Sequence, residues 1–142
     1  MTANNPKTTT SRRNWQMLKE EIRTPNAPLP LGSYSQGVRV GSHLYLSGQC
    51  GFEPESRELV SEKAGEQARQ ALLNLRCVLE AAGADMTNLV TVRVYISSDD
   101  DWAEVNQAYG EFFQHPYPAR TTIPAALGAG ILVEIDGIAV LS

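Results

Sequence analysis

Residues 118–140 read PARTTIPAALGAGILVEIDGIAV, and they decide how the rest of the chain is interpreted. The stretch contains two strand-like runs, one with Arg120 and Thr122 and the next with Glu134 and Asp136. Residues two apart on a strand project from the same face, so each pair is expected to share a face. A guanidinium binds a ligand carboxylate through two parallel hydrogen bonds, and a carboxylate beside it can accept a proton from water. A cleft shared by the two runs suits hydrolysis that acts on a small carboxylic acid. An arginine and a glutamate on neighbouring strands more often form a structural ion pair, so from these residues alone both interpretations of Arg120 and Glu134 stay open.

The composition is that of one soluble domain. The chain has 142 residues, of which 42% are hydrophobic and 20% charged, values far from those of disordered sequences. The net charge of −4 gives no general field that would attract phosphate backbones or anionic membranes, so neither a nucleic acid nor a membrane is expected as a partner. Cys50 and Cys77 lie outside any CxxC or histidine-rich spacing, which predicts free thiols, no metal site and a cytoplasmic protein.

The N-terminal part is poor in residues that can be buried. We expect residues 1–21 to form a flexible extension and residues 22–142 to form a single domain. Within residues 15–22 the apolar side chains have helical spacing, which predicts two turns of helix. Three prolines at positions 25, 28 and 30 then favour an extended approach to the domain.

The rest of the chain alternates strand and helix patterns. A hairpin is predicted from Tyr34 to Gly48 around a Gly41-Ser42 turn, with Gly48 as a bulge or a point of close ligand approach. Apolar residues recur every three or four positions over 61–82, and this predicts a helix that stops at Gly83. Residues 89–97 alternate as a strand does, and the acids at 99–101 are interpreted as caps of a second helix.

This order predicts an α+β sandwich, in which two helices pack on one face of a mainly antiparallel or mixed sheet. No segment remains to cover the other face of the sheet. We therefore expect that face to associate with further copies of the chain in a closed oligomer.

Six stretches in this order carry a resemblance to a known family: TPNAPLPLGSYSQGV, LYLSGQ, QARQALLNLRCVLEAAG, DDWAEVNQAYGEFF, PARTT and VEIDGIAV. Together they resemble the reactive intermediate deaminase (RidA, or YjgF/YER057c/UK114) family over residues 22–140. The resemblance implies a chorismate-mutase-like α+β fold and a homotrimer with clefts between subunits. It also implies hydrolysis of reactive enamines and imines to 2-ketoacids and ammonia, without a cofactor.

The motifs also suggest site residues. By resemblance, Arg120 holds the substrate carboxylate, Glu134 positions or activates the attacking water, and Tyr34 lines the cleft. Gly48 resembles a backbone contact, and Asn106 a polar lining residue. Where many deaminases of the family have a cysteine, this chain has Thr122, which is counted here as a substrate-binding residue.

The chain departs from the family's common sequence at two positions, and two other functions are possible alternatives to a deaminase. Thr122, and Ser33 in place of the common proline before the tyrosine, point to a substrate preference that differs from that of the central family members. One alternative is a non-enzymatic module in which Arg120 captures a carboxylate metabolite. The other is an endoribonuclease, which the acidic balance and the lack of a histidine pair disfavour.

Overall fold

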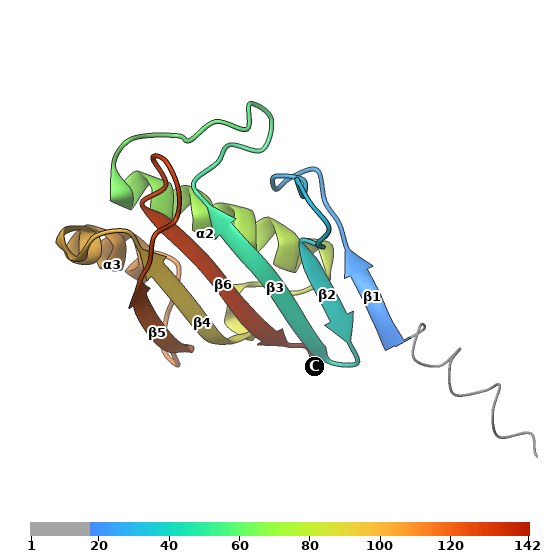
Figure 1. Ribbon diagram of the computed structural model, residues 1–142. Coiled ribbons are helices and arrows are strands. Elements are labelled where there is room, and N and C mark those ends of the chain that lie inside the picture. Colours follow the sequence, from blue (N-terminus) through green and yellow to red (C-terminus); the bar gives the residue numbers. More distant parts are fainter. Residues whose placement is uncertain (1–17) are drawn as a thin grey trace, which may run out of the picture.

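The computed structural model describes residues 18–142 and shows two layers, a twisted sheet with two helices against one face (Figure 1). The sheet has six strands. The elements are β1 (Lys19–Ile22), β2 (Gly37–Val40), β3 (His43–Cys50), α2 (Ala64–Ala81), η1 (Met86–Asn88), β4 (Leu89–Ile96), η2 (Asp99–Asp101), α3 (Trp102–Gly110), β5 (Ala119–Pro124) and β6 (Val133–Val140). The expected α+β sandwich is confirmed.

The strand order is β1-β2-β3-β6-β4-β5, so the last strand of the chain lies in the middle of the sheet. β6 pairs antiparallel with β3 on one side and with β4 on the other. Only the pairing of β4 with β5 is parallel, which makes the sheet mixed. Residues 118–140 thus supply the edge strand β5 and the central strand β6.

The helix α2 buries its apolar stripe against the sheet. Leu72, Leu75 and Leu79 are fully buried there, as helical spacing at three and four residues requires. The helix ends before Gly83, whose φ of +78° is the left-handed conformation that glycine adopts most readily. It begins at Ala64 rather than at residue 61, because Ser61 accepts a hydrogen bond from the Lys63 amide in a preceding turn.

Two local predictions were wrong. Residues 19–22, predicted to be helical, form the edge strand β1, because pairing with β2 satisfies their backbone groups; residues 15–17 of that predicted helix lie outside the described part. Of the expected N-terminal extension over residues 1–21, residues 1–17 lie outside the described part. The acids at 99–101 form the turn η2, whose cap is the Ser98 hydroxyl, while Asp101 provides no side-chain cap to α3.

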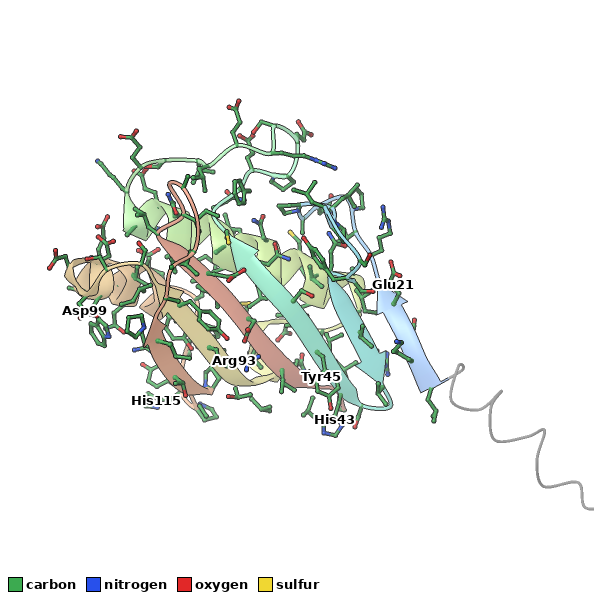
Figure 2. All side chains as sticks on the ribbon, viewed as in Figure 1. Glu21, His43, Tyr45, Arg93, Asp99 and His115 are labelled. Carbon is green, nitrogen blue, oxygen red and sulfur yellow. The ribbon has the colours of Figure 1, made fainter. Side chains whose placement is uncertain are left out.

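The face of the sheet that the helices leave open carries both apolar and charged side chains. Tyr45 pairs with Val38 on one side and Ile138 on the other, and 46% of its surface is exposed. Further along the same face, Arg93 forms an ion pair with Asp136 at 2.8 Å. Figure 2 shows Tyr45 and Arg93 on this face, turned away from the helices.

Candidate functional site

Glu134 lies on β6 opposite Cys50 of β3, next to an irregularity in the pairing of the two strands. The register shifts between Leu46 and Gln49, so Gly48 stands in a bulge, as the sequence predicted. A Cβ atom at position 48 would lie 2.7 Å from Oε1 of Glu134, closer than real contacts allow. Gly48 therefore leaves the space that the Glu134 carboxylate occupies.

A hollow of about 170 Å³ opens in front of this carboxylate, and we call it the Glu134 hollow. Tyr34 enters it from the segment before β2, so the structure brings together three of the predicted site residues: Tyr34, Gly48 and Glu134. More than half of the Tyr34 side chain is exposed, as suits a residue at the mouth of a binding site. The hollow is lined by Pro28, Leu29, Leu31, Tyr34, Gly48, Gln49, Cys50, Phe52, Arg57 and Glu134.

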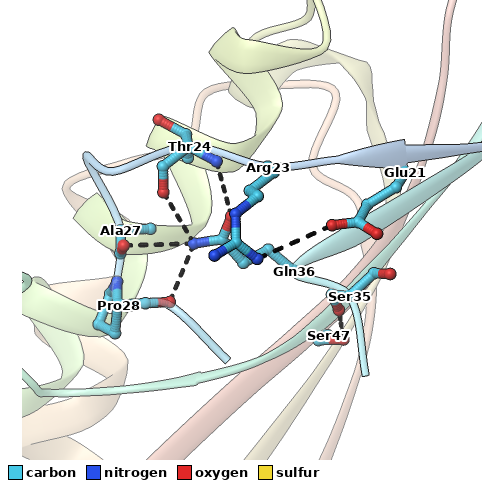
Figure 3. A network of polar contacts seen from close by, with 8 residues as sticks. All are labelled: Glu21, Arg23, Thr24, Ala27, Pro28, Ser35, Gln36 and Ser47. Carbon is cyan, nitrogen blue, oxygen red and sulfur yellow. Dashed lines mark hydrogen bonds and ion pairs between the residues drawn. The ribbon is translucent and has the colours of Figure 1, made fainter. Parts of the chain in front are cut away.

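The wall that carries Tyr34 is held in place by a buried glutamine. Gln36 is 1% exposed, and its amide group donates to the carbonyl oxygens of Thr24, Ala27 and Pro28 at 2.9 to 3.2 Å. Its own oxygen accepts from the Thr24 amide at 2.7 Å. Figure 3 shows these bonds converging on Gln36 from an irregular segment. One side chain thus satisfies backbone groups that no strand or helix pairs.

Cys50 was predicted only to be a free thiol, which is confirmed, but the structure places it in the Glu134 hollow. Burial, followed by the charge and the hydrogen bond of Glu134, raises the pKa of its thiol to about 12. Cys50 is therefore a neutral donor beside the carboxylate. Cys50 is the last residue of β3, and its place beside Glu134 depends on the pairing of β3 with β6, which sequence spacing does not show.

Arg57 is a second lining residue that sequence reasoning missed. Residues 51–60 fold into a small hairpin closed by a bridge between Phe52 and Leu59. The tip of this hairpin brings Arg57 to the Glu134 hollow. Among the residues that line it, Arg57 is the only one with a positive charge.

The remaining predicted residues gather elsewhere. Arg120 of β5, Asn106 of α3 and Thr122 of β5 line a second, shallow depression, and we call them the Arg120 cluster. The guanidinium lies 4.7 Å from the ring centre of Tyr109 and 5.7 Å from that of Trp102, so two aromatic rings of α3 orient it. In the described part of the chain no carboxylate forms an ion pair with Arg120, which leaves its hydrogen-bond donors free for a ligand.

The Glu134 hollow and the Arg120 cluster lie on opposite faces of the sheet. Glu134 of β6 lies beside Tyr95 of β4, whereas Arg120 of β5 lies beside Val92 of β4. Val92 and Tyr95 are an odd number of residues apart, so their side chains point to opposite faces of the sheet. Because side chains alternate along a strand, Arg120 points to the helix-covered face and Glu134 to the open one. The expectation that the two share a cleft is therefore wrong for a single chain, and so is the alternative of an ion pair between them.

The described residues contain no group of histidine, cysteine and acidic side chains that could hold a metal ion. Among them there is also no helix long and apolar enough to cross a membrane. The groups that the two clusters offer to a ligand are the Glu134 carboxylate, the Arg120 guanidinium, and the hydroxyls and backbone amides around them.

Comparison with known proteins shows the family of the chain. A family model described as endoribonuclease L-PSP matches residues 24–141. A 2-iminobutanoate/2-iminopropanoate deaminase of Dermatophagoides farinae is 43% identical over 124 residues, covering 87% of this chain and 97% of the relative.

Solved structures of similar proteins indicate the same family. RidA of a Psychrobacter species superposes with a TM-score of 0.82 at 38% identity, covering 86% of this chain and 99% of that one. Escherichia coli TdcF with bound serine superposes with a TM-score of 0.82 at 35% identity, covering 87% and 99%. The chain belongs to the RidA (YjgF/YER057c/UK114) family, to which the endoribonuclease L-PSP model corresponds.

Proposed function

We propose that this protein is a deaminase that hydrolyses reactive 2-imino acids, and the enamines in equilibrium with them, to 2-ketoacids and ammonia. The observation that carries the proposal is that Glu134, Gly48 and Tyr34 line one hollow, in which the Glu134 carboxylate faces a space large enough for a small molecule. The deaminase names of relatives about 40% identical over most of the chain give the same reaction.

The site is completed between subunits. Arg120 and Glu134 project from opposite faces of one sheet, so the two groups can meet only when a second chain places its β5 edge on the open face of the first. Tyr45 and Ile138 give that open face an apolar surface to bury. A homotrimer is the closed arrangement that we propose, with the Glu134 hollow of each subunit facing the Arg120 cluster of a neighbour.

The reaction then proceeds by positioning and proton transfer. The guanidinium of Arg120 binds the substrate carboxylate, and Asn106 and Thr122 offer further polar contacts beside it. Glu134 accepts a proton from a water molecule as the water oxygen attacks the imine carbon, and a carbinolamine forms. Glu134 passes that proton to the nitrogen, which completes the carbinolamine. The hydroxyl proton then moves to the nitrogen by way of Glu134 as the C–N bond breaks, so the nitrogen leaves as ammonia and the carbon becomes the carbonyl of the ketoacid.

Tyr34 and the backbone at Gly48 complete the proposed site. The tyrosine ring closes the mouth of the hollow, and an amide beside the glycine can approach the ligand closely because no Cβ intervenes. Imines hydrolyse unaided, so the protein has to supply only a modest acceleration, and no cofactor takes part in this mechanism.

The test is release of ketoacid from an imine made in situ by an amino-acid oxidase, with semicarbazide present to trap the imine that remains. We expect the wild type to speed ketoacid release, and Arg120→Ala and Glu134→Gln to abolish the effect. Arg76→Ala is the matched control, since Arg76 lies on α2, where it pairs with Glu80. No acceleration with any imine would leave the chain a carboxylate-binding module, which predicts saturable binding without turnover.

Mixing two inactive variants tests the shared site directly. In mixed oligomers of Arg120→Ala and Glu134→Gln, some interfaces join an intact Glu134 to an intact Arg120. Random mixing in equal amounts makes about one quarter of the sites intact, so activity should return to about that level after dissociation and reassembly. Absence of recovery in verified mixed oligomers would contradict a site between subunits.

Two further points belong to this proposal. We propose a cytoplasmic location, which the free thiols of Cys50 and Cys77 support. Endoribonuclease activity remains the alternative because the matching family model carries that description. RNA cleavage that persists in both Arg120→Ala and Glu134→Gln would indicate a different site or a contaminant, whereas cleavage lost in both would favour the ribonuclease.

A further inference from the structure

The backbone at Arg57 has an unusual conformation for its residue type. Its φ is +60°, a left-handed conformation in which a residue with a Cβ atom is strained. The turn fixes this conformation: the Arg57 amide donates to the Glu53 carbonyl and the Glu53 amide to the Glu58 carbonyl, both at 2.9 Å. Glycine would adopt the same turn without strain, so an arginine here calls for a functional reason.

The position of the side chain suggests one. Arg57 lines the Glu134 hollow together with apolar residues such as Leu31 and Phe52. Three glutamates lie near it in sequence, yet in the described part of the chain Arg57 forms no ion pair with any of them. Its guanidinium is therefore available to a ligand that reaches the hollow.

The proposed reaction already assigns one carboxylate of the substrate to Arg120 and places the reacting carbon beside Glu134. A group on the substrate side chain then lies in the rest of the hollow, where Arg57 is the only cation. A guanidinium presents paired donors that match a carboxylate, and it favours an anionic group over a methyl group of similar size.

We propose that Arg57 is a specificity-determining residue that directs this protein to 2-imino acids with a second, distal carboxylate. The inference rests on the proposed function and names its substrate class. Four-carbon compounds make the comparison sharp: 2-iminosuccinate carries a carboxylate where 2-iminobutanoate carries a methyl group, and the stable acids succinate and butanoate differ in the same way.

Binding of the stable acids tests the inference without turnover. By titration calorimetry on the wild-type oligomer, succinate should bind at least about tenfold more tightly than butanoate, because it gains a charge-assisted contact. Arg57→Gly should remove that preference, and Arg57→Lys should retain part of it. Arg76→Ala, which also removes one positive charge, should leave the preference as it is. Equal binding of the two acids by the wild type would overturn the inference.

Turnover provides the second measurement. The ratio of kcat/KM for 2-iminosuccinate to kcat/KM for 2-iminobutanoate should fall about tenfold in Arg57→Gly. A wild type that accelerates both imines, with a ratio that Arg57→Gly does not change, would overturn the role of Arg57 and keep the deaminase. A wild type that accelerates neither imine but binds succinate through Arg57 would overturn the deaminase and keep the binding preference.

Discussion

Gly48 and Glu134 occupy complementary spaces: a Cβ atom on residue 48 would stand 2.7 Å from Oε1 of Glu134 and 2.9 Å from its carboxyl carbon. The contact is with the end of a side chain, which can rotate away, and not with backbone. A glycine at this position thus decides where the carboxylate lies, and it has little to do with whether the strand forms.

The first prediction follows from this contact. Gly48→Ala should lower deaminase activity at least about tenfold, because the added methyl group moves the Glu134 carboxylate, the proposed acceptor of the proton from water. The free energy of unfolding should fall by less than about 1 kcal/mol, since the glutamate side chain can adjust. Paired measurements of kcat/KM and of urea unfolding check both parts.

Gly51 provides the contrasting control. A Cβ atom there would lie 2.6 Å from the Cα atom of Gln67 in helix α2, and backbone cannot move aside as a side chain can. Gly51→Ala should cost about 2 to 3 kcal/mol of stability through overpacking. Equal losses of stability for the two variants would show that the Gly48 contact is structural and not a matter of positioning the carboxylate.

The second prediction concerns the thiol of Cys50. Its pKa of about 12 means that very little thiolate exists near neutral pH, and the thiolate is the form that reacts with iodoacetamide. Alkylation of Cys50 should therefore be slow at pH 7 to 9 and should become faster as the pH rises toward 12. Glu134→Gln removes a negative charge and should lower the pKa, so the reaction at a given pH becomes faster.

Replacing Cys77 by serine leaves Cys50 as the only thiol for this measurement. The same shift has a consequence for stability. The folded state holds the Cys50 proton more tightly than the unfolded state does. The contribution of this proton to the free energy of unfolding is therefore complete below the ordinary thiol pKa of 9.0, and it decreases as pH rises from there toward about 12. An alkylation rate that Glu134→Gln leaves unchanged would contradict the contact between thiol and carboxylate.

The third prediction concerns Gln36. Gln36→Leu removes the donor that serves the carbonyl oxygens of Thr24, Ala27 and Pro28. Leaving buried polar groups unpaired should cost about 2 to 3 kcal/mol in the free energy of unfolding. Because this segment leads to Tyr34, activity should also fall. Gln107→Leu, at an exposed position of α3, should change stability by less than about 0.5 kcal/mol; a similar cost at both positions would contradict the role of the network.

The helices and the fold class could be predicted from the sequence because both depend on local pattern. Eighteen residues of α2 repeat their apolar side chains at helical intervals, and Gly83 marks the end. Residues 19–22 show the limit of this reasoning. Their strand forms through hydrogen bonds to β2, and the periodicity of a four-residue segment cannot indicate a partner elsewhere in the chain.

The predicted site residues came together only in part, for a similar reason. Spacing correctly placed Arg120 beside Thr122 and Glu134 beside Asp136, since each pair lies on one strand. Spacing could not show that the side chains of Arg120 and Glu134 point to opposite faces of the sheet, because this depends on the registers of β5 and β6 against β4. Cys50, Arg57 and Gln36 were missed since their roles arise from neighbours distant in sequence.

The fourth prediction concerns the open face of the sheet. Tyr45→Asp places a charge among Val38 and Ile138, where the proposed homotrimer buries apolar surface. We expect analytical ultracentrifugation to show smaller species, and activity to fall because Arg120 of a neighbouring subunit is lost from each site. Val60→Asp, at a position that is 40% exposed but lies on the loop before α2, should leave the oligomer intact. A wild type that is a monomer and active would contradict the shared site.

The last prediction concerns the strained turn at Arg57. Arg57→Gly relieves a left-handed conformation but makes the unfolded chain more flexible, so the net gain in the free energy of unfolding should be about 0.5 to 1 kcal/mol. Gly41 has the same φ of +60°, with no atom within 4 Å of a Cβ added there, so Gly41→Ala should lose about 1 kcal/mol through conformation alone.

Thermal unfolding of the two variants measures both effects, with opposite signs expected. A more stable Arg57→Gly protein that has lost its preference for succinate would show that arginine is kept at this position for binding, against a cost in stability. If Arg57→Gly is instead less stable than the wild type, the arginine contributes structural contacts that outweigh the strain. Its place in the hollow would then need no functional explanation.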